Sequence, residues 1–411
     1  MAAITGGPAH GRARGLVLVA KDWDTHEGAV MENTDVVVLG AGYAGLMAAL
    51  GAARRTRRLG GRVTLVNPSE RFTERLRMHQ VASGQALAEH RIPDLVAGAG
   101  IEFVQGWAER LDPARKVVVV GGRELRYDIA VLAIGSVADT GAVPGAAEHA
   151  FTLDGPDAAG RLAERVAGAP SVVVVGGGLT GVEAASEIAE RHPGRPILLL
   201  SRDVPGATMS APARAYLDGA LARLGVRVRA GVDVVEVRED GVTLAGGEVV
   251  PAGVVVWTTG FTAPPLAREA GLAVDGHGRV LVDATLRSVS HPDVYAAGDS
   301  AAIRQSWGMI HGTCQSGIPA GAYVGQAIAR HLRGRRAKPF RFGYIHQHVS
   351  LGRSDAIVQF TRPDDSPRRL FLTGRAAVRY KEAVISSPPP VYRLSRRVAL
   401  PASLFVLPAG R

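Results

Sequence analysis

Residues 35–58 read DVVVLGAGYAGLMAALGAARRTRR, and residues 171–191 read SVVVVGGGLTGVEAASEIAER. Each stretch begins with a short β-branched run, passes through a glycine-rich turn and ends in a segment with the composition of a helix. The glycines follow the spacing G-x-G-x-x-G in both copies, which is typical of strand-to-helix turns that hold the pyrophosphate of a dinucleotide. The repetition predicts two nucleotide-binding units of the same plan in one chain.

The glycines of such a turn have separate physical roles. The first permits the tight turn, the second lets backbone amides approach the pyrophosphate, and the third lets helix and strand pack closely. The helix N-terminus adds amides and a partial positive charge. The alternative, two turns without a ligand, is disfavoured because each motif follows a strand and opens a helix. The residues expected in the two turns are Gly40, Gly42, Tyr43, Ala44 and Gly45, and Gly176, Gly178, Leu179, Thr180 and Gly181.

The two units continue with the same succession of elements. In each, a second strand, a glycine-turned hairpin and a closing strand follow the helix. These elements are expected at 63–66, 116–127 and 129–136 in the first unit, and at 197–200, 242–251 and 254–261 in the second.

The chain has 411 residues, of which 46% are hydrophobic and 21% are charged. At roughly 150 residues per domain, this length predicts two or three domains. The single cysteine, Cys314, excludes a disulfide framework, a paired-cysteine redox centre and a zinc site built on several thiolates. His346 and His348 alternate on an expected strand, but two histidines without a third ligand are not a metal site. No apolar run reaches the length of a membrane span and no signal peptide is evident, so a cytoplasmic location is expected.

The charge balance is basic, with 48 lysines and arginines against 38 acidic residues, a net charge of +10. Such a balance suits an acidic or anionic partner. Nearly all the cations are arginine, however, and the clusters at 54–58 and 333–338 lack the interleaved aromatic residues that stack bases. We therefore expect no nucleic acid partner.

The repeated units, the second glycine motif with Glu183, and the segment VYAAGDSA at 294–301 resemble the two-dinucleotide-binding-domain flavoproteins of the pyridine nucleotide-disulfide oxidoreductase superfamily. Within it, VTLVNPSERF at 63–72, RMHQVASG at 77–84 and the lack of paired cysteines look most like type II NADH:quinone oxidoreductases and their apoptosis-inducing-factor-like relatives. The resemblance implies an α/β fold of two Rossmann-like domains plus a C-terminal α+β cap. It implies FAD in the first unit and NAD(P)H in the second.

The resemblance also implies a domain organisation in which the NAD(P)H domain is inserted in the FAD domain. In the cap, strands are expected at 340–345 and 356–360 and a helix at 374–384. The tail is expected to be disordered or, alternatively, to lie on a membrane surface, while the first residues read as a disordered extension before a second candidate start, Met31. The expected bounds are 1–30 for the extension, 31–140 with 263–334 for the FAD domain, 141–262 for the NAD(P)H domain, 335–387 for the cap and 388–411 for the tail.

In the first unit, the resemblance assigns roles to two side chains. Asn67 stands where the family usually has a carboxylate for the adenosine ribose, and an amide can still hydrogen-bond a hydroxyl. Asp299 would accept a hydrogen bond from the ribityl chain, with a helix N-cap as the alternative. The other cofactor-binding positions that the resemblance implies are Gln80, Ala108, Gly135, Gly260, Gly298, Cys314 and Gln315.

In the second unit, Ser201 and Arg202 stand at the strand end where a carboxylate is usual. Arg202 can pair with a 2′-phosphate, which favours NADPH, whereas Asp203 can still serve a 2′-hydroxyl of NADH. Glu183 resembles the family glutamate that faces the nicotinamide. The alternative for Glu183 is a plain helix-face carboxylate.

The segment MIHGTCQSGIPAG at 309–321 resembles the family helix start that points at the flavin pyrimidine. Its amides near Cys314 and Gln315 would stabilise the charge of reduced flavin. The paired glutamines of the quinone reductases are absent from 316–319, which weakens the quinone assignment. His79, with Gln80, falls where the family chain passes the flavin and could relay a proton, the alternative being a backbone-bonded histidine. Cys314 is expected to be a packed residue rather than a redox thiol.

The predicted reaction is hydride transfer from NAD(P)H to FAD, followed by electron transfer to an acceptor. The resemblance favours a quinone. The alternatives are a ferredoxin or rubredoxin, or a flavin-based redox-sensing regulatory protein. Glu183, His79 and Gln315 are the predicted catalytic residues. We also expect a homodimer, and we expect the tail to contact the inner face of the cell membrane peripherally.

Overall fold

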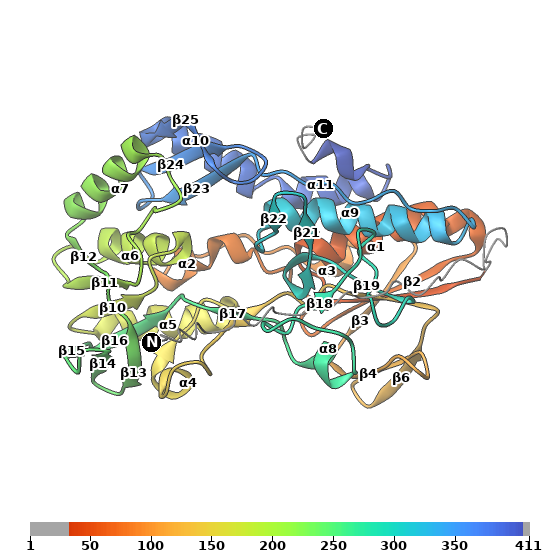
Figure 1. Ribbon diagram of the computed structural model, residues 1–411, viewed down its shortest axis with the longest axis horizontal. Coiled ribbons are helices and arrows are strands. Elements are labelled where there is room, and N and C mark those ends of the chain that lie inside the picture. Colours follow the sequence, from red (N-terminus) through yellow and green to blue (C-terminus); the bar gives the residue numbers. More distant parts are fainter. Residues whose placement is uncertain (1–32, 406–411) are drawn as a thin grey trace, which may run out of the picture.

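The structure is a computed structural model that describes residues 33–405. Two five-stranded parallel sheets, each with helices against it, confirm the predicted α/β fold with two Rossmann-like units (Figure 1). The disordered extension predicted at 1–30 lies outside the described residues.

The first sheet has the strand order β19-β7-β1-β2-β3 and only parallel pairs. Its central strand β1 is buried over Val36–Leu39, as a parallel strand that is covered on both faces of its sheet requires. The edge strand β19 comes from far along the chain, after the whole second sheet. The bounds are β1 Asp35–Leu39, β2 Arg62–Asn67, β3 Ile101–Gln105, β7 Ile129–Leu132 and β19 Val294–Ala296.

The second sheet repeats this plan with the order β12-β11-β10-β16-β9, again parallel. Its central strand β10 consists of four buried valines, and helix α6 (Leu179–Arg191) follows the second glycine turn. The bounds are β9 Ala150–Phe151, β10 Val172–Val175, β11 Ile197–Ser201, β12 Val226–Ala230 and β16 Val254–Trp257.

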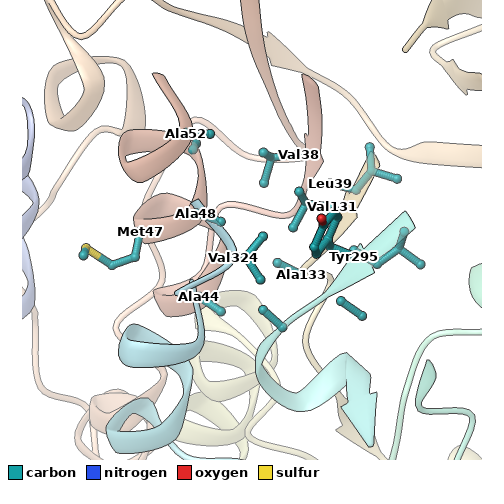
Figure 2. Packing of buried hydrophobic residues seen from close by; sticks show 14 of the residues in the cluster. Val38, Leu39, Ala44, Met47, Ala48, Ala52, Val131, Ala133, Tyr295 and Val324 are labelled. Atoms are coloured by element: carbon teal, nitrogen blue, oxygen red, sulfur yellow. The ribbon is translucent and has the colours of Figure 1, made fainter. Parts of the chain in front are cut away.

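Helices α1 (Tyr43–Thr56) and α9 (Cys314–His331) cross closely over the first sheet. Figure 2 shows Val324 of α9 pointing into the same cluster as Ala44 and Ala48 of α1 and Val38 of β1. Glycines allow this approach: a Cβ at Gly325 would lie 2.6 Å from the Gly51 carbonyl carbon, and one at Gly321 would collide with the Ala44 carbonyl oxygen. The α1 helix begins at Tyr43, directly after Gly42 of the glycine turn.

Both predicted hairpins are present, and each gains a third strand that the sequence pattern did not indicate. Two short antiparallel strands, β8 and β17, mark where the chain crosses between the two sheets and back. The hairpin sheets are β4 Ala108–Asp112, β5 Val117–Val120 and β6 Arg123–Arg126, and β13 Val234–Arg238, β14 Gly241–Leu244 and β15 Val249–Pro251, with β8 at Val137–Ala138 and β17 at Phe261–Thr262.

The C-terminal cap is an antiparallel sheet of β23 (His346–Ser350), β24 (Ala356–Thr361) and β25 (Pro367–Thr373), covered by α10 (Gly374–Ile385). The strand predicted at 340–345 is wrong. Phe340, Phe342 and Tyr344 alternate as strand residues do, and all three are buried, but they anchor an extended segment rather than a sheet. The amide of Phe342 donates to the Gln305 side chain instead of to a strand partner.

The prediction of a disordered tail from residue 388 is also wrong for the described part. Pro388–Ser395 forms helix α11, whose first turn accommodates three prolines because first-turn amides need no helical acceptor. Its Tyr392 is fully buried, lies edge-on to Phe72 at 5.6 Å and donates to the Tyr43 carbonyl oxygen at 3.3 Å. In Figure 1, α11 lies over α1 and α9.

Among residues 33–405, no helix is long and apolar enough to cross a membrane. The remaining elements are η1 Arg57–Leu59, η2 Arg75–Arg77, α2 Met78–Ala82, α3 Ile92–Val96, α4 Ala146–His149, α5 Pro156–Gly168, α7 Ala211–Arg223, α8 Leu266–Glu269, β18 Val280–Leu281, η3 Gly298–Ser300, β20 Ala301–Ala302, β21 Arg304–Gln305, β22 Gly308–Met309 and η4 Ala402–Leu404.

Candidate functional site

The first glycine turn forms an open cradle at the carboxyl end of β1. Gly40 has a φ of 95°, and a Cβ there would collide with the Ala133 carbonyl oxygen. A Cβ at Gly45 would collide with the Gly40 carbonyl oxygen, so helix and strand touch through backbone. Gly42, in contrast, faces open space, with nothing within 4 Å of its ideal Cβ. Backbone amides beside open space are what a pyrophosphate needs.

The second turn has the same shape at the end of β10. Gly176 has a φ of 119°, a Cβ at Gly181 would collide with the Gly176 carbonyl oxygen, and Gly178 faces open space. A Cβ at Gly177 would collide with Ser201 Oγ, so the end of β11 presses directly against this turn. Both cradles therefore fit a dinucleotide pyrophosphate. Thr180 lies in the first turn of α6, right after Leu179.

Asn67 ends β2 beside the first cradle and holds that turn itself. Its Oδ1 accepts from the Ala41 amide at 2.9 Å, and its Nδ2 donates to the Ser69 carbonyl oxygen at 2.7 Å. The side chain thus uses both polar atoms within the protein. Its predicted bond to a ribose stays a prediction.

Asp299 lies in η3, directly after β19, and faces the same cradle from the other side. Its Oδ2 accepts from Ser136 Oγ at 2.8 Å, next to Gly135. Gly298 comes close to Ala44, because a Cβ added there would lie 3.0 Å from the Ala44 Cβ. The structure thus brings Gly135, Gly298 and Asp299 together beside Ala44. No side-chain cap bond is formed at η3.

The start of α9 completes this region. Thr313 caps the helix, its hydroxyl accepting from the Ser316 amide at 3.2 Å. Burial, followed by the Asp299 carboxylate, raises the pKa of Cys314 to about 12, so its thiol stays protonated. The Gln315 side chain is bonded to the start of the cap, with Nε2 donating to the His346 carbonyl oxygen at 3.0 Å and Oε1 accepting from the Ile345 amide at 2.6 Å. The side chain of Gln315 therefore joins α9 to the cap.

A buried polar cluster lies where α2, α6 and the cap meet. Glu183 of α6 accepts from Lys381 Nζ of α10 at 2.6 Å and from the Ser350 amide of β23 at 3.0 Å. His79 Nδ1 of α2 is 3.4 Å from the other Glu183 oxygen. Lys381 is 2% exposed and also donates to Ser350 Oγ. Burial alone would raise the pKa of Glu183, but His79 and Lys381 outweigh it and lower the pKa to about 2.

Two neighbouring side chains of this cluster have incomplete hydrogen bonding. Gln80 is 2% exposed; its Oε1 accepts from Arg77 at 3.3 Å, whereas its Nε2 is buried without a partner. His348 Nδ1 is likewise buried and unpartnered. Buried polar atoms without partners are costly, so they mark a place where a bound polar group or a proton fits.

The remaining predicted positions lie apart from this cluster. Arg202 is exposed after β11 and pairs through Nε with Asp233 at 2.6 Å. Gly260 sits at the crossover, with an ideal Cβ 3.1 Å from the Asp139 Cβ. Ala108 begins the side strand β4 and pairs with Val120.

Sequence reasoning missed Lys381. Ala377, Lys381 and Ile385 follow the spacing i, i+4, i+8 on α10 and are all buried, so the lysine lies in the middle of the buried stripe. A cation on the apolar face of a helix was the signal that could have found it.

Comparisons with known proteins agree with this geometry. The family described as pyridine nucleotide-disulphide oxidoreductase matches residues 34–325. An NADH dehydrogenase-like protein of Mycobacterium tuberculosis is 34% identical over 352 residues, which cover 79% of this chain and 87% of that protein. A type II NADH:quinone oxidoreductase of Staphylococcus epidermidis is 25% identical over 360 residues, covering 79% and 89%.

Solved structures share the fold. NDH2 from Plasmodium falciparum in complex with NADH aligns with a TM-score of 0.77 at 15% identity, covering 90% of this chain and 97% of that one. The sulfide:quinone oxidoreductase of Aquifex aeolicus aligns with a TM-score of 0.74 at 19% identity, covering 88% and 92%. With both pyrophosphate cradles in place and a family match over most of its length, the chain belongs to the pyridine nucleotide-disulphide oxidoreductase family and is an FAD-dependent oxidoreductase that uses NAD(P)H.

Proposed function

We propose that the chain is an NAD(P)H:quinone oxidoreductase. The observation that carries the proposal is the pair of glycine cradles, one on each sheet, because two nucleotide cofactors can then meet between them. Bound FAD would accept a hydride from bound NAD(P)H and pass the electrons to the acceptor. The name of the Staphylococcus epidermidis relative supports a quinone as that acceptor.

The chain's own groups have separate tasks in this reaction. The amides of the first turn and of the α9 N-terminus, near Cys314, stabilise negative charge, while Asp299 accepts hydrogen bonds from hydroxyls of the bound nucleotide. Asn67 positions the first glycine turn through the Ala41 amide, and Ser136 positions the Asp299 carboxylate. Glu183 is fixed in its ionised form beside the second cradle by Lys381. These groups are already bonded in place, so little reorganisation accompanies the reaction.

Stopped-flow spectroscopy tests the proposal on the FAD-loaded protein. We expect fast flavin reduction by NAD(P)H and fast reoxidation by menadione. Reoxidation by ferredoxin or rubredoxin alone would replace the quinone with an iron–sulfur protein, and a reduced flavin that persists with every acceptor would indicate a redox-sensing protein. Asp299→Ala should lower FAD occupancy, because it removes an acceptor worth about 1–3 kcal/mol. A wild-type protein that shows no flavin spectrum after FAD addition would contradict the proposal.

We further propose that α11 and the segment after it contact an anionic membrane surface. Leu394 at the end of α11 and Val398 just after the helix are each 50% exposed, and the exposed Arg393 and Arg397 stand next to them in the chain. Leu404, farther along, is 65% exposed. Apolar side chains flanked by cations are typical of interfacial segments.

Sedimentation with vesicles tests the membrane contact. Wild-type protein should sediment with vesicles containing anionic phosphatidylglycerol more than with neutral vesicles. The Leu394→Ser/Val398→Ser variant should sediment less, whereas Val249→Ser, an exposed valine of β15 in the hairpin sheet, serves as the control. Equal sedimentation of all three proteins would refute the contact. The predicted homodimer stays a prediction.

A further inference from the structure

The imidazole of His79 lies between two carboxylates of one helix. Glu183 and Glu187 are one turn apart on α6, so their side chains share a face. His79 is 3% exposed; its Nδ1 is 3.4 Å from Glu183 Oε2 and its Nε2 is 3.8 Å from Glu187 Oε1. Glu187 is 1% exposed. The three groups form a buried row.

One ring nitrogen of His79, Nε2, forms no hydrogen bond and can take a proton. A neutral imidazole carries one N–H, and when Nδ1–H points at Glu183, the lone pair of Nε2 faces the Glu187 carboxylate. Nε2 has no hydrogen-bond partner in the structure. Glu187 Oε1 already accepts from Arg353 Nη1 at 3.4 Å, so the unpaired atom of the row is His79 Nε2, and a proton shared with Glu187 would give it a partner. Burial lowers the pKa of His79 to about 4 and raises that of Glu187, which moves the proton affinities of the two groups towards each other.

Charged groups surround the row on every side and leave its net charge close to balance. Lys381 neutralises Glu183. Arg353 forms ion pairs with two carboxylates, Glu187 at 3.4 Å and Glu382 at 2.8 Å. Three more polar groups face the row. Gln85 donates to Glu187 at 2.9 Å, and His348 has an unpartnered Nδ1. Arg77 pairs with Glu74 at 3.3 Å and with Glu382 at 3.0 Å. Arg353 reaches solvent, its side chain being 35% exposed. A proton can therefore enter at Glu187 without crossing the core.

The proposed reaction requires one proton from water in each turnover. NAD(P)H gives a hydride, which is two electrons and one proton, whereas a quinone becomes a quinol by taking two electrons and two protons. The balance is NAD(P)H plus H⁺ plus quinone giving NAD(P)⁺ plus quinol. Glu183 lies beneath the cap, bonded to Lys381 and Ser350, so neighbouring side chains can bring that proton to it.

We propose that His79 and Glu187 hold this proton and deliver it to Glu183, an inference that rests on the proposed quinone reductase function. The Glu187 O–H bond breaks as an N–H bond forms at His79 Nε2, and the Nδ1–H bond breaks as an O–H bond forms at Glu183 Oε2. Glu183 then gives the proton toward the acceptor, rotation of the His79 ring restores an N–H that faces Glu183, and Glu187 takes another proton from solvent past Arg353 and Gln85. Lys381 stays an ammonium and returns Glu183 to its ionised form.

The first test measures proton linkage without turnover. Isothermal calorimetry of NADP⁺ and NAD⁺ binding to the FAD-loaded protein, in two buffers of different ionisation enthalpy, counts the protons exchanged. A cationic nicotinamide beside the row disfavours the stored proton, so the wild-type protein should release a fraction of a proton. His79→Gln and Glu187→Gln should bring this release close to zero. Glu190→Gln, on the same helix and bonded to the Arg353 amide and Ser354, is the matched control and should behave as wild type.

The second test separates the half-reactions. In stopped flow, His79→Gln and Glu187→Gln should leave flavin reduction within about threefold of wild type but slow reoxidation by menadione tenfold or more, with a loss that grows as pH rises. Unchanged proton release and unchanged reoxidation in both variants would overturn the proposal. Its failure is distinguishable from failure of the proposed function, because proton release on nucleotide binding needs no quinone. Should His79→Gln fail to fold, Glu187→Gln alone decides.

Discussion

Arg202 is the residue on which we expect the choice between the two nicotinamide donors to depend. The buried Ser201 stands where a carboxylate would repel a 2′-phosphate, and Arg202 next to it is exposed. Asp233 holds the guanidinium at its Nε, which fixes the direction of the side chain. We expect this arrangement to favour NADPH over NADH.

Replacing Arg202 tests this expectation. Arg202→Ala should raise the KM for NADPH about tenfold or more and change the KM for NADH little, because a charge-assisted hydrogen bond is worth about 1.5–3 kcal/mol. Arg229→Ala, which removes another surface pair, with Glu248, is the control. Binding of adenosine 2′,5′-bisphosphate compared with 5′-AMP gives the same comparison without turnover. Equal changes for both donors would show that Arg202 does not contact the 2′-position.

Lys381 illustrates what a buried ion pair does to stability. Lys381→Met leaves the Glu183 carboxylate buried without its main partner, and we expect a loss of about 3–5 kcal/mol in the free energy of unfolding. The pKa of Glu183 should rise from about 2 in this variant. The double variant Glu183→Gln/Lys381→Met removes both charges and should be more stable than the single one. Urea unfolding of the wild-type protein, the two single variants and the double variant measures the interaction free energy of the pair. A double variant no more stable than Lys381→Met would contradict the pairing.

At the scale of elements, the crossing of α1 and α9 depends on the absence of side chains at its contact points. Gly321→Ala and Gly325→Ala place a Cβ against backbone of α1, which cannot shift as a side chain can. We expect each to destabilise the protein by about 1–3 kcal/mol or more. Gly160→Ala on α5, with open space around its ideal Cβ, should stabilise it by up to about 1 kcal/mol. Thermal unfolding distinguishes the two directions, and a stabilising Gly325→Ala would show that the helices can move apart.

Elements that form from local pattern were predictable, and elements that depend on distant partners were not. The glycine turns and the strands β1 and β10 follow from spacing and β-branched runs, because those signals act within a few residues. The segment Phe340–Tyr344 alternates as a strand does, yet its partners are a loop and a side chain. Helix α11 was not predicted, although a first helical turn tolerates its three prolines.

The same distinction holds for the candidate site. Each cradle is formed by consecutive residues, so its glycine spacing was enough to predict it. The contacts among His79, Glu183 and Lys381 join three segments that meet only in the folded chain. His79 and Glu183 were named from the resemblance, but their contact and the part of Lys381 follow only from tertiary packing.

At the scale of the whole molecule, buried histidines make stability depend on pH. Burial lowers the pKa of His79 and of His346 to about 4 and that of His348 to about 3, whereas an unfolded histidine titrates near 6.5. Below pH 6.5 the unfolded chain therefore binds more protons than the folded one, so folding stability is full above pH 6.5 and falls as the pH drops towards 4. With all three titrating, the slope approaches about 4 kcal/mol per pH unit.

Urea midpoints at pH 7.5, 6.0 and 5.0 measure this decline. His348→Gln should reduce the slope by about a third, because one of three groups no longer titrates. Below about pH 4.5, Glu183 adds to the loss, since its folded pKa lies below its unfolded value. A stability that stays level from pH 7.5 to 5.0 would show that these histidines are protonated in the folded protein.

The position of β19 in the chain has a consequence for biosynthesis. A ribosome completes β1, β2, β3 and β7 first, but the edge of β7 pairs with β19 only when Val294–Ala296 emerge, after the entire second sheet has been made. Until then Ile129–Leu132, buried in the finished protein, presents an open apolar edge. The inserted unit, whose strands are contiguous in the chain, can fold in the meantime. We therefore expect this edge to need protection from other chains during the time in which the second unit is translated.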